Sequence, residues 1–274
     1  MFLRFDATNG GGKFSEIADE VVLLDIIEQP AETDVQTVDF AGGHGMRVGN
    51  VRRKSLSVQL VYTINTQDPA KWAAAHDKVV QWAVKADSLT VSTRPGKKLT
   101  GKFYIPPAMG SVLRWTQELT ITFTAYGVPF WQDTSSLVSK FISRGESTQF
   151  TCLCTADSVP VQASISNDGT EMLTEVILNV GHTKLHLQGL QLDPAPDSGD
   201  GMVQVDALQI GSLTGHDFTI KTLGTGSSGG ESYLHTRTPD SSDVLLADTR
   251  EPTPVYFWAD QPATCWLTCT RWWV

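Results

Sequence analysis

The sequence predicts a mainly β protein with two domains, an α+β domain that contains one helix and a second domain built of strands only. A chain of 274 residues is long enough for two domains that each bury a core. Alternation of apolar and polar residues recurs along the chain, whereas helical periodicity is convincing in one segment only. Residues 1–133 carry 14 Lys and Arg against 14 Asp and Glu, and residues 134–274 carry 7 against 16. The second part therefore holds the whole net charge of −9, which disfavours binding to nucleic acid.

The first domain is expected over residues 1–133, and its clearest strand lies at 54–64. The apolar residues that alternate along this strand are Leu56, Val58, Leu60, Tyr62 and Ile64. An amphipathic helix is expected over 68–87, with Asp68 as its N-cap and Pro69 in the first helical position. Its apolar stripe consists of Trp72, Ala75, Val79, Trp82, Ala83 and Ala86.

The remainder of the chain is predicted to be strands. Two strands joined across Pro95 and Gly96 follow the helix, and another alternating strand lies within 111–127. The stretch VPFWQDTSS then turns polar, which places the domain boundary after residue 133. Short alternating segments fill the second domain, residues 134–274: 159–166, 171–180, 183–192, 202–210, 217–223, 255–259 and 265–274. Segments of this kind, separated by loops rich in Gly, Ser, Asp and Pro, predict a β-sandwich or jelly roll.

The stretch AGGHGMRVGNVRRKS, residues 41–55, combines four glycines with four cations and has two interpretations. A dinucleotide-binding loop requires G-x-G-x-x-G between a strand and a helix, so that the phosphate lies on the helix N-terminus. Here Gly43 and Gly45 are followed by Gly49, one position out of register, and a strand comes next. The G-x-x-x-x-G-K-[ST] loop is missing from the sequence as well, so we expect no bound nucleotide and no cofactor.

The charges around this stretch favour an arm that contacts another protein. Eight acids occur between residues 14 and 39 without any Lys or Arg: Glu16, Asp19, Glu20, Asp25, Glu28, Glu32, Asp34 and Asp39. Four cations then follow within eight positions: Arg47, Arg52, Arg53 and Lys54. A negative face and a positive arm allow head-to-tail docking on an identical copy, which closes into a ring if the rotation permits. The alternative is a solvated loop whose charges are unrelated.

Patterns for catalysis and metal binding are weak. The sequence contains no G-x-S-x-G, no H-E-x-x-H and no Cys with an obvious His partner, so we expect no enzymatic activity. Cys152, Cys154, Cys265 and Cys269 lie in strand-like sequence, where residues four apart are separated by roughly 13 Å. We therefore expect small buried thiols and no metal site. No run approaches ~18 apolar residues, so no membrane-spanning helix is expected.

Two further groups of residues leave alternatives open. Asp193, Asp197, Asp200 and Asp206 lie among glycines and either bind Ca²⁺ or form a bare acidic turn, because the spacing of an EF-hand loop is missing. Five aromatic residues near the C-terminus either stack on sugar rings or pack in the core and at interfaces: Tyr256, Trp258, Trp266, Trp272 and Trp273.

The order of these segments resembles a known family. The stretches RRKSLSVQLVY, DPAKWAAAHDKVVQWAV, KFYIP and QELTITFTAYGVPFW, within residues 38–132, resemble the N-terminal domain of the distal tail protein (Dit) family of long-tailed bacteriophages. The second domain, which ends in TCTRWWV, is similar to the galectin-like or jelly-roll C-terminal domain of these proteins. The resemblance implies an N-terminal β-sandwich or split barrel with one helix and a hairpin arm.

The resemblance also implies a function and partners. A phage or prophage distal tail protein forms a hexameric ring through which DNA passes without specific binding, and links the tail tube and tape-measure protein to the tail tip, baseplate and receptor-binding proteins. It lies at the tail tip of the virion and assembles in the host cytoplasm. Because the arm embraces the neighbouring subunit, Arg47, Arg52, Arg53 and Lys54 are candidates for inter-subunit contacts. The alternative function is a carbohydrate-binding or adhesion module that acts through the Trp-rich second domain.

Overall fold

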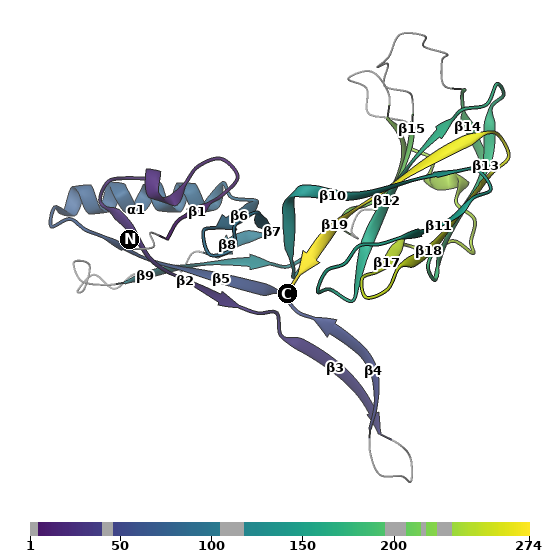
Figure 1. The fold of residues 1–274 in the computed structure, drawn as a ribbon. Coiled ribbons are helices and arrows are strands. Elements are labelled where there is room, and N and C mark those ends of the chain that lie inside the picture. The colour runs from purple at the N-terminus through teal and green to yellow at the C-terminus, as the bar shows by residue number, and fades with distance from the viewer. Residues whose placement is uncertain (1–4, 40–45, 105–117, 195–206, 215–217, 224–231) are drawn as a thin grey trace. The chain divides into compact units, whose positions relative to one another are not determined.

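The computed structural model describes residues 5–39, 46–104, 118–194, 207–214, 218–223 and 232–274 (Figure 1). The chain divides into two compact units: Met1–Thr134 together with Val274, called unit 1, and Ser135–Trp273, called unit 2. The division falls after residue 134, where the sequence places a boundary after residue 133. The predicted mainly β fold is confirmed, and the described residues contain one α-helix. That helix is not long and apolar enough to cross a membrane.

An antiparallel sheet of four strands forms the centre of unit 1 (Figure 1). In spatial order the strands are β2 (Val21–Gln29), β5 (Leu56–Ile64), β9 (Leu119–Ala125) and β8 (Lys102–Tyr104). The alternation in β5 is confirmed, because its five apolar positions are all buried and the residues between them are half-buried. Strands β2 and β8 lie at the two ends of this order, so each has one partner strand among the described residues.

The helix α1 (Pro69–Val84) packs on this sheet, as its apolar stripe predicts. Asp68 is the N-cap, and its side chain accepts a hydrogen bond of 2.9 Å from the backbone N–H of Ala70. Trp82 on α1 contacts Phe14 and Phe103, with ring centroids 5.2 and 5.3 Å apart. The contacts continue into the sheet, because Phe14 lies 5.5 Å from Tyr62 of β5. Burial raises the pKa of Tyr62 to about 12.

The predicted pair of strands at 88–105 is three strands. They are β6 (Ser88–Val91), β7 (Lys97–Thr100) and β8, and the short strand β1 (Ala7–Thr8) pairs with β6. Gly101 separates β7 from β8, which belong to different sheets. Its backbone approaches β9 so closely that a Cβ atom would lie 2.2 Å from the carbonyl oxygen of Thr124. The sequence predicted one continuous strand after Gly96, which is wrong. The break at Gly101 depends on the close approach of β9, a strand that is distant in the chain.

Strands β3 (Thr33–Asp39) and β4 (Met46–Arg53) form an antiparallel ribbon in unit 1. They pair with each other and with no other strand among the described residues. Figure 1 shows this ribbon extending beyond the ends of β2 and β5. The hairpin arm expected from the sequence is therefore present in the fold.

Unit 2 contains two sheets whose alternate residues are buried, the arrangement of a β-sandwich. The first sheet contributes β10 (Trp131–Ser143), β19 (Ala263–Trp273), β12 (Ser158–Asn167), β15 (Ala207–Gly211) and β16 (Thr219–Leu223) to this unit, and β17 (Leu246–Asp248) also pairs with β12. The start of β10 pairs with β7, so the same sheet also includes β7, β6 and β1. The second comprises β11 (Ser147–Phe150), β18 (Thr253–Ala259), β13 (Leu173–Val180) and β14 (Thr183–Leu192). The sequence missed β10, which starts in unit 1 and continues across the boundary, together with the short strands β11 and β17.

Replacement of Gly101 by Ala tests the close approach of β8 to β9. We expect Gly101→Ala to lower the free energy of unfolding of unit 1 by about 3 kcal/mol, because the added Cβ overlaps a backbone carbonyl that cannot move alone. Native-state hydrogen exchange of the β5 amides measures this loss within unit 1. The matched control is Gly11→Ala, where the nearest atom to the new Cβ is 4.0 Å away. An equal effect of the two variants would contradict the packing described here.

Candidate functional site

The ribbon of β3 and β4 carries the four cations that the sequence analysis singled out. The register places Arg52 opposite Asp34, Arg53 opposite Thr33 and Arg47 opposite Val38. The basic and acidic segments are thus neighbouring strands of one hairpin in the same chain. Gly43 and Gly45 lie at 40–45, outside the described residues.

The base of the ribbon is held by two of these cations. The Lys54 ammonium lies 3.1 Å from Oε2 of Glu32, and the Lys54 backbone N–H donates to the Glu32 carbonyl oxygen at 2.8 Å. The hydrogen bond and charge of Glu32 raise the pKa of Lys54. The Arg53 guanidinium lies over the ring of Phe130, 5.6 Å from its centroid. Arg53 and Lys54 therefore have partners within their own unit, a role that the sequence did not show, while Arg47 and Arg52 stay predicted contact residues.

Part of the acidic segment is also engaged within the chain. The Arg94 guanidinium binds Glu28 at 2.6 Å and lies over the ring of Trp131, 5.3 Å from its centroid. The side chains of Arg94 and Glu28 are 33% and 23% exposed, so this pair is shielded from water more than the other ion pairs of unit 1. Glu16 forms a pair with Lys13 at 3.6 Å. The acidic face available to a partner is therefore smaller than the sequence suggests.

Strand β2 exposes apolar side chains at the edge of the four-stranded sheet. Val22, Leu24 and Ile27 are 43%, 38% and 40% exposed. The register shifts between Leu23 and Asp25, so Leu24 lies in a β-bulge. Edge strands of monomers usually carry charges or are covered, because an exposed apolar edge invites pairing with another chain. The β2 edge is thus a surface suited to contact with protein.

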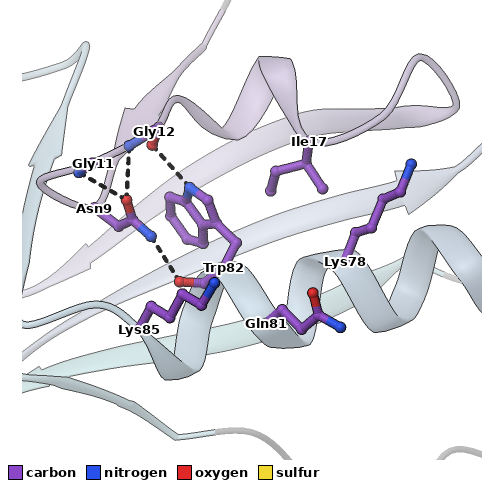
Figure 2. A pocket seen from close by; sticks show the side chains of 8 residues that line it. All are labelled: Asn9, Gly11, Gly12, Ile17, Lys78, Gln81, Trp82 and Lys85. Carbon is purple, nitrogen blue, oxygen red and sulfur yellow. Dashed lines mark hydrogen bonds between the residues drawn. The ribbon is translucent and has the colours of Figure 1, made fainter.

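A cavity of about 380 Å³ lies in unit 1 between α1 and the loop that follows β1 (Figure 2). The loop contributes Asn9, Gly11 and Gly12 to the lining, and Ile17 follows further along the chain. The helix contributes Lys78, Gln81 and Trp82, and Lys85 follows as its C-cap residue. We call this the α1 pocket.

The wall of the α1 pocket is fixed by hydrogen bonds to the buried side chain of Asn9. Its Oδ1 accepts from the backbone N–H groups of Gly11 and Gly12 at 3.2 and 3.0 Å, and its Nδ2 donates to the Trp82 carbonyl oxygen at 2.7 Å. The Trp82 indole N–H donates back to the Gly12 carbonyl oxygen at 2.8 Å. Figure 2 shows these bonds joining the loop to the helix. No sequence pattern indicated this pocket, because its two sides are about 70 residues apart in the chain.

The aromatic residues of unit 2 divide between core and surface. Trp272 is buried, Tyr256, Trp258 and Trp273 are partly exposed, and Trp266 is 51% exposed. The ring of Phe141 meets Trp266 edge-on with a centroid distance of 6.5 Å. Core packing therefore holds for Trp272, whereas stacking of the exposed members on sugar rings stays a prediction.

Titratable groups of unit 2 form local pairs. Nε2 of His186 lies 2.7 Å from Oε1 of Glu175, and the Gln188 amide donates to the same oxygen. The hydrogen bond from His186, with that from Gln188, holds the pKa of Glu175 below its usual value. Within the described ranges no three His, Cys, Asp or Glu side chains are arranged to hold a metal ion. Of the four Asp residues considered for Ca²⁺, three lie outside those ranges: Asp197, Asp200 and Asp206.

The cysteines are thiols, and three of the four are buried. Cys265 and Cys269 lie on β19 as predicted, and burial raises the pKa of the Cys265 thiol. Cys152 and Cys154 follow β11 and lie outside any strand, so their expected strand placement was wrong. Hydrogen bonds of the next residues explain the departure, because the N–H groups of Thr155 and Ala156 both donate to the carbonyl oxygen of Trp272.

These features define a class of fold: a unit with one helix on a four-stranded sheet and a projecting β-ribbon, followed by a β-sandwich unit. A solved structure of this class is that of SPP1 Dit (gp 19.1), described as a paradigm of the hub adsorption apparatus in phages that infect Gram-positive bacteria. The TM-score is 0.65 at 11% sequence identity, over 98% of this chain and 99% of SPP1 Dit. The resemblance to the Dit fold predicted from the sequence is thus confirmed.

Two further structures, both of the phage P2 baseplate in its activated conformation, have lower scores. The chain from the structure with Ca has a TM-score of 0.46 at 8% identity, over 99% of this chain and 98% of the other. The chain from the structure with Sr has a TM-score of 0.48 at 8% identity, over 97% of both chains. No family model matches the sequence. No curated protein sequence matches it either.

Replacement of Asn9 tests how the wall of the α1 pocket is held. We expect Asn9→Ala to destabilise unit 1 by about 2–4 kcal/mol, because it removes three hydrogen bonds and leaves buried backbone groups unsatisfied. Asn9→Asp keeps the acceptor for the two glycine N–H groups but places an oxygen against the Trp82 carbonyl oxygen, so it should loosen the helix side of the wall and leave the glycine side closed. Hydrogen exchange of the Gly11 and Gly12 amides reports the opening of the loop directly. Unchanged exchange in Asn9→Ala would refute this account of the wall.

Proposed function

We propose that this protein is a structural, non-enzymatic component of a phage or prophage tail, a distal tail protein of the Dit type. One observation carries the proposal: both units match the fold of SPP1 Dit in a single alignment over nearly the whole of each chain. A β-sandwich alone supports many functions. The combination of such a unit with a helix-bearing sheet and a β-ribbon is far more restrictive.

The protein assembles as a ring, most simply a hexamer, through repeated head-to-tail contacts between copies of unit 1. Two features support this. The apolar edge of β2 and the opposite edge at β8 allow the four-stranded sheet of one copy to adjoin that of the next. The β3–β4 ribbon supplies an arm that reaches a neighbour with Arg47 and Arg52 along it. Each contact must bury on the order of 1,000 Å² or more to hold a permanent ring.

In this role the ring joins the tail tube and tape-measure protein to the tail tip or baseplate and to receptor-binding proteins. Unit 2 anchors the host-adhesion components, and DNA passes through the ring without specific binding. The protein then resides at the tail tip of the virion, after assembly in the host cytoplasm. The mechanism is binding alone and requires no cofactor.

A second candidate function is carbohydrate binding by unit 2. It is favoured by the exposed Trp266 beside Phe141, since aromatic faces stack on the apolar faces of sugars. A sugar-binding module predicts saturable binding on a glycan array that Trp266→Ala abolishes. A tail hub that acts by protein contacts alone predicts no such binding.

Charge reversal on the ribbon tests the arm. We expect Arg47→Glu with Arg52→Glu to shift the protein from six chains of 29.9 kDa each towards single chains, because the altered arm would repel an acidic neighbour. Size-exclusion chromatography with light scattering measures the mass. Lys71→Glu together with Lys140→Glu is the control, since it changes the total charge equally at positions that are not part of the ribbon. A mass that is insensitive to the ribbon charges would rule out the arm as a contact.

The β2 edge is tested separately. We expect Val22→Lys with Ile27→Lys to prevent ring closure while leaving unit 1 folded, because both side chains are exposed and lysine on an edge strand opposes pairing. The same light-scattering measurement gives the mass, and circular dichroism checks the fold. The control is Ala73→Lys with Ala74→Lys, two exposed positions on α1 that add the same charge away from the β2 edge and the ribbon. A ring that survives the first pair of changes would exclude this edge from the contact.

A further inference from the structure

The α1 pocket presents two ammonium groups without a counter-charge. Lys78 and Lys85 line its helical side, both are exposed, and neither forms an ion pair within the part of the chain that the structure describes. They are seven residues apart, which separates them by about 10 Å along one face of a helix. Figure 2 shows Trp82 between them, with the glycine loop opposite.

The glycine loop leaves room for a ligand beside these charges. Gly11 and Gly12 contribute no side chains, and a Cβ atom at either would have its nearest neighbours 4.0 Å away. The hydrogen bonds of Asn9 and Trp82 keep the loop at a fixed distance from the helix. The pocket is therefore an open trough with a rigid backbone wall, an aromatic floor and two cations along its rim.

We propose that the α1 pocket binds an extended acidic segment of another protein, with one carboxylate on Lys78 and another on Lys85. A segment in the polyproline II conformation has three residues per turn and a rise of about 3.1 Å per residue, so carboxylates three positions apart lie on one side of it about 9 Å apart, which matches the spacing of the two lysines. The Gln81 side chain lies between the lysines on the helix and is placed to hydrogen-bond the backbone of the segment. This site goes beyond the role as a tail hub and does not depend on ring formation.

The charges favour a protein over a nucleic acid. A protein that binds DNA tightly neutralises about 6–10 phosphates, whereas this pocket offers two cations. Over residues 1–133, cations and acids are equal in number at 14 each, so no wider basic surface surrounds the pocket. Two carboxylates match the two ammonium groups in charge. The hydrogen bonds between them are charge-assisted and therefore stronger than those between neutral groups.

The sheet geometry favours a different protein over a second copy. A second copy that adjoins β2 or β8 extends the sheet within its own plane. The α1 pocket lies between the helix and the glycine loop, neither of which is an edge strand of that sheet. The occupant is thus a separate acidic chain.

The test is an NMR titration of the full-length protein with a six-residue peptide, acetylated and amidated at its ends, that carries two glutamates three positions apart. At millimolar peptide we expect saturable shifts of the Gly11 and Gly12 amides and of the Trp82 indole N–H. Lys78→Glu and Lys85→Glu should each weaken binding about tenfold. The matched control, Lys71→Glu, lies on the same helix outside the pocket and should bind as the parent does. Gly11→Leu, which fills the trough without a change of charge, should also abolish the shifts.

Other results would overturn the proposal. Equal shifts with a peptide that has glutamines in place of the glutamates would exclude carboxylate recognition. Stronger displacement by a DNA oligonucleotide than by the peptide would assign the pocket to nucleic acid. A change of oligomeric mass in Lys78→Glu with Lys85→Glu, but not in Lys71→Glu, would assign it to a second copy. The absence of shifts in the parent protein would leave no acidic-segment site at all.

Discussion

Unit 1 depends on the contacts of Trp82. Its ring packs against Phe14 and Phe103, so the N-terminal segment and β8 meet on the same side of α1. Its indole N–H and its backbone carbonyl oxygen each hydrogen-bond to the loop at Asn9 and Gly12. One residue thus sets the position of the helix on the sheet and also the depth of the α1 pocket. A buried indole N–H needs a hydrogen-bond partner, so the position of the Trp82 ring restricts where the Gly12 carbonyl can lie. The loop in turn restricts the position of the Trp82 ring.

Acidic and basic residues of unit 1 contact one another within the fold, although their distribution along the sequence suggests surfaces for a partner. The acids of 16–39 and the cations of 47–54 look like two complementary surfaces when they are counted along the chain. In the fold, antiparallel pairing brings them side by side, and Lys54 and Arg94 are bound to Glu32 and Glu28. Exposed pairs such as that of Lys54 contribute little to stability because water screens them, so their main effect is on geometry. The apolar edge of β2 is consequently the stronger argument for a contact between copies.

The sequence predicted those elements whose causes are local. Asp68, Pro69 and the stripe from Trp72 to Ala83 define α1 by capping and periodicity, and the alternation in β5 defines a strand with one buried face. The break at Gly101 was missed because it results from the approach of Thr124, a residue far along the chain. Strand β10 was missed because its apolar and polar residues do not alternate in the sequence WQDTSSLVSKFIS. Neither the Arg94–Glu28 pair nor the α1 pocket has a local signal, since each joins segments more than 60 residues apart.

The sheet edges of unit 1 and its α1 pocket are suited to two different kinds of contact. Growth of a sheet occurs at its edges and within its plane, so a ring built through β2 and β8 leaves the outer side of α1 uncovered. That side carries the α1 pocket, which combines a rigid backbone wall with two lysines that form no ion pair within the described part of the chain. A protein whose copies join through sheet edges therefore retains a second, chemically different surface on every copy. In a closed ring this surface recurs once per subunit, and a partner with several acidic segments would bind with the advantage of multivalency.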